Sequence, residues 1–214
     1  MTMLASDSVR CRNCGASSEH TVLMSTNAFG SPDLDLRPPE MKRSTMDTWL
    51  QLCPQCGYCA PDLSQSPADP AVLRSAAYRA ALRSADFPEL ARRFLAYALT
   101  AGVSDPAAAA HAYLQAAWVC DDAGRGEQAA KCRRQSAAWF RQCKPFASDE
   151  QGVGTGAVLV DVLRRGGQFA EATGECQAAL ASPAATGVIR KVLEFQLRLV
   201  ASADTGAHEV SECE

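Results

Sequence analysis

The sequence predicts a mainly α protein, in which a small cysteine-bearing β module precedes antiparallel helical hairpins. Two observations support this order. Two Cys-x-x-Cys-Gly elements lie before residue 60, among turn residues and short β-prone runs. From about residue 67 onward the sequence is rich in Ala and carries repeated helix-start signals. We therefore expect a cysteine module over 1–66, a helical domain over 67–206 and a disordered tail over 207–214.

Two short runs in the module predict β-strands, at 21–24 and 48–52, because they combine β-branched, aromatic and aliphatic residues. Between them, the Gly and Pro content predicts a loop that begins at Phe29 and ends at Pro39. This loop carries Asp33, Asp35 and Arg37. Two carboxylates beside an Arg also fit a site for a cation or an amine, but we expect these side chains to cap turns and to pair with one another at the surface.

The four cysteines of the two Cys-x-x-Cys-Gly elements predict a metal site. They are Cys11, Cys14, Cys53 and Cys56. In such an element the backbone forms a tight knuckle, and the Gly adopts a conformation that a side chain would hinder. Two knuckles supply four sulfurs in a tetrahedron, which is the arrangement that Zn²⁺ prefers. Four thiolates leave no open coordination position, so we expect a structural zinc-ribbon-like site.

Other interpretations of the cysteines stay open. A single pair resembles a thioredoxin-like redox motif, although the βαβ context of that motif is absent. Cys59 extends the second pair toward an iron–sulfur pattern, but no fourth nearby Cys followed by Pro completes it. We expect Cys59 to be a thiol packed beside the knuckle. The remaining cysteines fit the helical core, and the three histidines, His20, His111 and His208, fit the surface.

Helix starts are frequent in the second part of the chain. Asp69-Pro70 and Asp105-Pro106 each place a capping Asp before a Pro at the first helical position. With the other signals, we expect helices at about 70–84, 88–101, 106–122, 126–143, 152–165, 168–181 and 184–202.

Two of the expected helix pairs resemble each other. Gly124 stands five residues before Ala129, and Gly167 stands five residues before Ala172. The run Gly-Gln-Phe-Ala-Glu-Ala from Gly167 resembles the turn of a tetratricopeptide repeat, in which a small Ala lets two helices approach closely. The offset of 43 residues exceeds the usual repeat length of about 34. An ordinary Ala-rich helical bundle is the alternative.

Charge is unevenly distributed, although the net charge is only −3. Residues 67–147 hold eleven Lys and Arg against seven Asp and Glu, whereas residues 148–214 hold five against ten. Five basic residues gather on or just after one expected helix, and we expect them to form a solvated helix face or to steer an acidic partner. They are Lys131, Arg133, Arg134, Arg141 and Lys144.

The chain of 214 residues begins without the basic and apolar runs of a secretory signal. No apolar run approaches the roughly 20 residues that span a bilayer. We expect a cytoplasmic, soluble protein without a membrane partner.

The first third also resembles the N-terminal module of a bacterial family of uncharacterised proteins. The shared features are the early Cys11 and Cys14, the loop at 29–39, and a strand with Trp49 that runs into Cys53-Pro-Gln-Cys-Gly-Tyr58. Members of that family carry a tetratricopeptide-like helical tail, so the resemblance implies the same for this chain. It implies no reaction.

Together these patterns predict a non-catalytic zinc-binding protein that acts as a protein–protein interaction adaptor. A concave helical surface would bind a protein or peptide partner. Association with nucleic acid is an alternative, but residues 1–66 hold five Lys and Arg against seven Asp and Glu. A thiol-redox enzyme is a further alternative, which needs a reactive thiolate such as that of Cys59.

Overall fold

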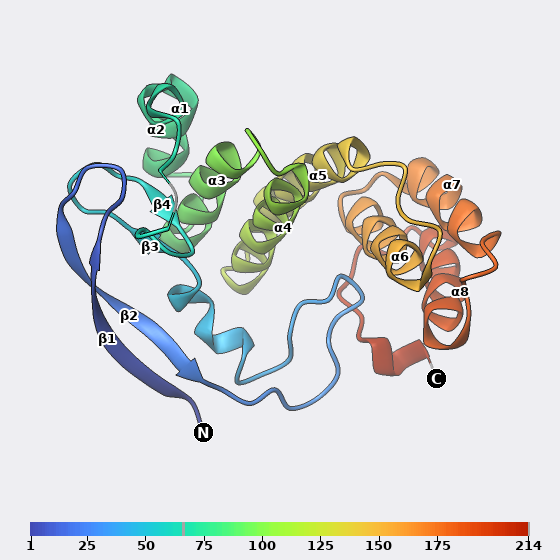
Figure 1. Ribbon diagram of the computed structural model, residues 1–214. Coiled ribbons are helices and arrows are strands. Elements are labelled where there is room, and N and C mark those ends of the chain that lie inside the picture. Colours follow the sequence, from blue (N-terminus) through green and yellow to red (C-terminus); the bar gives the residue numbers. More distant parts are fainter. Residues whose placement is uncertain (66, 214) are drawn as a thin grey trace.

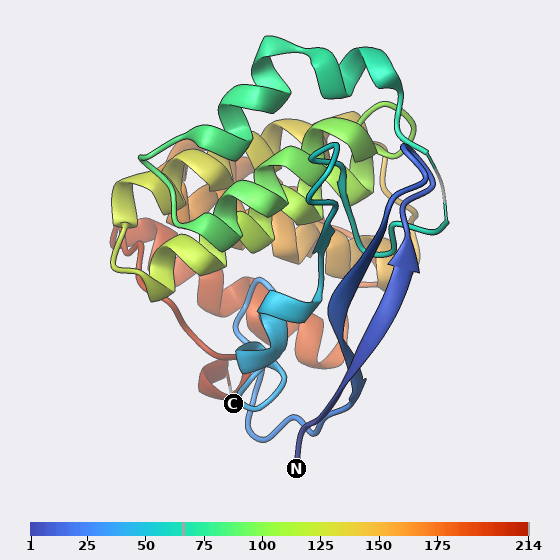
Figure 2. The ribbon, with the colours of Figure 1, turned by 90° about the vertical axis from the view of Figure 1, so that its left-hand side faces the viewer.

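The computed structural model describes residues 1–65 and 67–213. Two β-hairpins are followed by α-helices arranged in an arch, with the first hairpin standing along one side of the array (Figure 1, Figure 2). The helices are α1 (Pro70–Arg74), α2 (Ala76–Arg83), α3 (Glu89–Ala101), α4 (Pro106–Asp122), α5 (Gly126–Gln142), α6 (Glu150–Arg165), α7 (Phe169–Leu180) and α8 (Gly187–Ala201). The structure is thus mainly helical, as predicted.

The first hairpin pairs β1 (Met3–Arg10) with β2 (Ser17–Ser25) in antiparallel register. The strand expected at 21–24 is the middle of β2. The sequence analysis missed β1, because most of its side chains are exposed and several are Ser or Asp, so the strand depends on its pairing with β2.

The second hairpin pairs β3 (Gln51–Leu52) with β4 (Cys59–Ala60). The strand expected at 48–52 is therefore too long. The residues before it form a 3-10 helix, η1 (Arg43–Thr48), in which Thr45 and Thr48 bind backbone carbonyls through their hydroxyl groups. Such local bonds compete with an extended strand.

The helix expected at 70–84 is two helices, α1 and α2. Ser75 lies between them with an extended backbone, and its hydroxyl accepts a hydrogen bond from the amide of Tyr78. A Ser side chain in this position caps the second helix and ends the first. The other helices begin and end within about three residues of the expected positions.

Helices that are neighbours in the sequence also pack against one another, most extensively α3 on α4 and α4 on α5. The turns after α4 and α6 are equivalent. Gly124 and Gly167 both have positive φ, and in each turn the amide of the next residue bonds to the carbonyl five residues before it, at 2.8 Å. This backbone pattern is a Schellman motif, and the 43-residue offset found in the sequence relates the two copies.

The loop at 29–39, which we call the strap, runs from β2 beneath the helices along the inner side of the arch (Figure 1). The residue at the expected module boundary, 66, lies outside the described part of the chain. The strap nevertheless places residues of the N-terminal module against α4, α5 and α6, so the two parts share one interior.

The tail at 207–213 is ordered, in contrast to the expected disorder, and residue 214 lies outside the described residues. It contains a 3-10 helix, η2 (Val210–Cys213), and pairs with the strap. The amide of Leu34 bonds to the carbonyl of His208, and the amide of Val210 bonds to the carbonyl of Pro32, both at 2.9 Å. The pairing partner lies far away in the sequence, which is why local composition did not reveal it.

Candidate functional site

The four predicted ligand residues come together. The sulfurs of Cys11, Cys14, Cys53 and Cys56 all lie within 4.8 Å of one another. The Cys11–Cys56 sulfurs are 3.8 Å apart and the Cys14–Cys53 sulfurs are 3.6 Å apart. Four ligands at a Zn–S distance of about 2.3 Å would stand about 3.8 Å apart at the corners of a tetrahedron. The group is of tetrahedral type and suggests a structural metal.

Each pair of cysteines lies in the turn of a hairpin. Cys11 follows the end of β1 and Cys53 follows the end of β3. In each turn the Gly amide bonds back to the carbonyl of the first Cys, at 2.8 Å for Gly15 and 2.9 Å for Gly57. The φ angles of these glycines are 77° and 73°, which only Gly adopts without strain. The two knuckles therefore have the same backbone structure.

The electrostatics of the cluster favour a bound cation. Burial opposes ionisation of Cys53, but hydrogen bonds from the amides of Cys56 and Gln55 outweigh it and lower the pKa of the Cys53 thiol. Burial raises the pKa of Cys56 to about 12, and burial also raises the pKa of Cys11. Four thiolates so close together repel one another, so a metal ion is needed to hold them all in the charged form.

Cys59 belongs to the helical core instead of the thiol group. Its side chain is completely buried, and its amide donates a hydrogen bond to the Tyr78 hydroxyl at 3.0 Å. That hydroxyl donates in turn to the carbonyl of Gly57, at 2.9 Å. Burial raises the pKa of the Cys59 thiol to about 12, which disfavours the thiolate that a redox nucleophile needs. Through Tyr78, α2 supports the second knuckle.

The other cysteines and the histidines stand apart from this group. Cys120, Cys132 and Cys176 are buried among apolar side chains of the helices, as expected. Among the described residues, no His or carboxylate oxygen joins the four sulfurs. The candidate metal site therefore offers four thiols as ligand groups.

A second polar cluster lies where the strap meets the helices, and it corrects the surface position expected for Asp33, Asp35 and Arg37. All three side chains are buried. One oxygen of Asp35 accepts hydrogen bonds from the indole N–H of Trp118 at 2.9 Å and from Arg165 at 3.2 Å. Asp35 therefore binds residues of α4 and α6, whereas Asp33 accepts a hydrogen bond from Arg43 at 2.9 Å.

Residues at the ends of the helices complete this cluster. Asp121, at the end of α4, accepts hydrogen bonds from Arg133 at 2.6 Å and from Arg165 at 2.8 Å. Arg133 also lies 3.5 Å from Asp35. These two carboxylates and two guanidinium groups balance in charge, which a buried network requires. Next to it, Arg37 forms an ion pair with Asp122. We call Asp35, Trp118, Asp121, Arg133 and Arg165 the strap network.

The expected basic helix face is only partly solvated. Arg133 is 2% exposed and belongs to the strap network. Arg141 pairs with Glu171, and Lys144 lies 2.6 Å from Glu175, so these two cations connect to α7. Three of the five cations are thus paired with carboxylates of the same molecule, whereas Lys131 and Arg134 are exposed.

Comparison with known proteins identified no relative of this chain. No protein-family model, no curated protein and no solved structure matches the chain. The resemblance to the bacterial family therefore stays a prediction. Within the described residues, the helices are too short or too polar to cross a lipid bilayer.

Proposed function

We propose that this protein is a non-catalytic, zinc-stabilised adaptor for protein–protein interactions. The proposal that the protein binds zinc rests on the closed group of four sulfurs, which lie within 4.8 Å of one another. Such a site has no position for a substrate or a water molecule, so its role is structural. Binding of a partner therefore takes place on the surfaces that the metal module and the helices form together.

Several features favour one zinc ion over an iron–sulfur cluster. Sulfur distances of 3.6 and 3.8 Å fit around a single ion, whereas a cluster of several irons and inorganic sulfides needs more room between the cysteines. Zinc accepts four thiolates in a tetrahedron and carries out no redox chemistry. Cys59, the one additional thiol of that segment, is packed in the core.

The adaptor half rests on the helical array. Successive helices pack in order, and the turns at Gly124 and Gly167 share one backbone pattern, which supports a tetratricopeptide-like arrangement. Arrays of this kind present an extended inner surface to protein or peptide partners. In this chain the strap and the tail contribute to that surface (Figure 1).

Two measurements test the proposal. Elemental analysis of protein purified from medium with both zinc and iron is expected to give about one zinc per chain. Iron in place of zinc, or a metal content near zero, would contradict the proposal that the protein binds zinc.

Crosslinking and affinity capture of the tagged full chain from its native host is expected to recover a specific protein partner. Recovery of none, or of nucleic acid with salt-dependent affinity, would contradict the adaptor half.

A further inference from the structure

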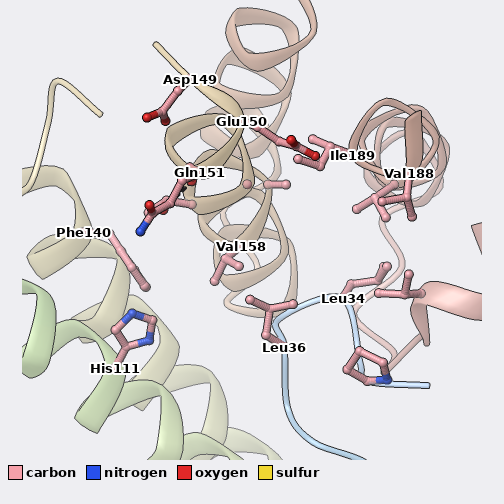
Figure 3. A pocket seen from close by; sticks show the side chains of 16 residues that line it. Leu34, Leu36, His111, Phe140, Asp149, Glu150, Gln151, Val158, Val188 and Ile189 are labelled. Carbon is pink, nitrogen blue, oxygen red and sulfur yellow. Dashed lines mark hydrogen bonds between the residues drawn. The ribbon is translucent and has the colours of Figure 1, made fainter. Parts of the chain in front are cut away.

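An apolar groove of about 840 Å³ lies between the strap, α6 and α8 (Figure 3). Its walls come from parts of the chain that are far apart in sequence. Leu34 and Leu36 of the strap form one side, Val158 of α6 lies beside Leu36, and Val188 and Ile189 of α8 form the other side. The volume falls in the range of about 300–1,000 Å³ that binding pockets occupy.

Leu36 is held in this groove by its neighbours. Its backbone has a positive φ of 63°, which is unfavourable for a Leu, and its side chain is 58% exposed. The flanking Asp35 and Arg37 are both buried, the first in the strap network and the second in its ion pair with Asp122. Because both neighbours point into the protein, the side chain of Leu36 is presented outward.

A second apolar side chain is presented in the same way on the opposite wall. Val188, in the first turn of α8, is 54% exposed and lines the groove. Folding leaves more than half of the surface of both Val188 and Leu36 exposed to water. Contact with an apolar group would remove this area from water, which is favourable by about 25 cal/mol for each Å².

The charged side chains that line the groove are carboxylates. Its other polar lining residues are His111, Gln151 and Thr155, and burial lowers the pKa of His111 and so disfavours its charged form. The residues that line the groove include Asp149 and Glu150 at the start of α6, but neither Lys nor Arg.

From the tail, Val210 lines the groove and the exposed Glu209 precedes it, whereas the carboxylate of Glu212 is paired with His208 at 2.8 Å. One carboxylate oxygen of Asp149 accepts a hydrogen bond from the amide of Gly152 at 2.9 Å, which leaves it less available to a ligand. Glu150 is exposed at the rim of the groove. An aliphatic floor with acidic groups beside it is complementary to an apolar group that carries a positive charge.

We propose that this groove docks a short segment of a partner protein in which aliphatic side chains alternate with Lys or Arg. The inference rests on the proposed adaptor function and assigns its docking site and the chemistry of its partner. The aliphatic side chains would pack on Leu36 and Val188, and the basic side chains would reach Glu150 and the tail.

A peptide fits this arrangement better than a small molecule. Sites for small molecules place a few polar groups so that they converge on the ligand and fix its orientation. Here Glu150 lies at the start of α6 and Glu209 lies beside the lining residue Val210 of the tail, so the acidic groups come from separate segments of the chain. Only a chain with several side chains can contact these acidic groups and the floor at once.

The test begins with a random library of roughly twelve-residue peptides displayed on phage, selected on the metal-loaded full chain. The expected result is enrichment of sequences that combine Leu, Ile or Val with Lys or Arg. A fluorescein-labelled copy of the most enriched peptide then serves as the probe, and its affinity is measured by fluorescence anisotropy. No enrichment, or enrichment of sequences without basic residues, would overturn the proposal.

Three variants locate the binding. Leu36→Gly removes the exposed side chain and also relieves the positive φ, so it is expected to weaken binding about tenfold while the melting temperature stays equal or rises. Val188→Ala is expected to weaken binding less. Its matched control is Val103→Ala, since Val103 is 63% exposed but lies in the turn before α4, outside the groove. Binding that is equal in Leu36→Gly and in the wild type would overturn the proposal.

The charge of the rim is tested separately. Glu150→Gln is expected to weaken binding about threefold at low salt and less at high salt. Its control is Glu127→Gln, because Glu127 is also exposed in the first turn of a helix, α5, and does not line the groove. Equal effects of the two variants would show attraction to the net charge alone and would contradict a docking site.

The native capture experiment separates this inference from the proposed function. If a partner is recovered equally by the wild type and by Leu36→Gly, the protein is an adaptor but the groove is not its docking site. If no partner is recovered at all, the adaptor function fails as well.

Discussion

The thiol cluster and the strap network both tie the N-terminal residues into the molecule, but they are built in opposite ways. The cluster joins two local knuckles, each specified by five consecutive residues. The strap network joins Asp35 to residues 83 and 130 positions later in the chain. The cluster needs an added cation, whereas the carboxylates and guanidinium groups of the network neutralise one another. The comparison shows that a polar cluster can be predicted from the sequence only where its geometry depends on neighbouring residues.

The largest effect is expected at the thiol cluster. Cys53→Ser should reduce zinc from about one ion per chain to nearly none, because Ser is a poor replacement for a thiolate ligand. Both knuckles should then lose protection against hydrogen exchange, and so should α2, whose Tyr78 bonds to the second knuckle. Hydrogen-exchange mass spectrometry measures this. The strap should stay protected, and its loss of protection would show that the two clusters are not independent. Chelation of the wild-type protein serves as the control.

The strap network should show the next largest effect. Asp35→Ala leaves the buried Trp118 N–H without its acceptor and removes one of the two carboxylates that bind Arg165, so we expect a loss of about 3–5 kcal/mol in the free energy of unfolding. Urea unfolding measures it, and the zinc content should remain unchanged. Glu89→Ala is the control, since it removes an exposed ion pair with Arg93 worth less than about 0.5 kcal/mol. A similar loss in both variants would contradict the assigned role of the network.

A smaller effect should distinguish the two knuckles. Tyr78→Phe removes the hydroxyl that bonds to Gly57 and Cys59, which should cost about 1–3 kcal/mol in unfolding free energy with zinc retained. Exchange should increase at the second knuckle and not at the first. Tyr97→Phe is a suitable control, because within the described residues the Tyr97 hydroxyl makes no hydrogen bond. Equal exchange at both knuckles would show that α2 does not support one of them selectively.

The smallest effect should appear with pH, in opposite directions at the tail and at the thiol cluster. Burial alone would lower the pKa of His208, but the carboxylates of Glu212 and Asp204 outweigh it and raise the pKa. A raised pKa stabilises the docked tail below the unfolded value of about 6.5, and this contribution of less than about 1 kcal/mol is lost as pH rises through the folded value. Zinc binding, in contrast, weakens as pH falls.

Exchange rates of residues 207–213 between pH 5 and 9 measure the effect on the tail. The rates must first be corrected for the intrinsic pH dependence of exchange. His208→Gln should abolish the remaining change, because a Gln does not titrate in this range. A tail that undocks at low pH instead would contradict the assigned role of the two carboxylates.

Much of the secondary structure followed from local chemistry. Asp105 before Pro106 placed the start of α4, and the glycines after each Cys pair placed the knuckles, because capping bonds and positive φ depend on neighbouring residues. The expected helix at 70–84 failed for a local reason as well, since Ser75 was not recognised as a cap.

The sequence by itself determined the mainly helical fold, the equivalent turns at Gly124 and Gly167, and the two Cys-x-x-Cys-Gly knuckles, because each depends on residues within a few positions of one another. Only the tertiary structure decided that Asp33, Asp35 and Arg37 of the strap are buried, that the tail is ordered and that an apolar groove lies between the strap, α6 and α8. Asp35 and Arg37 look like surface charges until helix ends more than 80 residues away supply their partners. The environment of a charge, and not its type, decides whether it lies in water or in the interior.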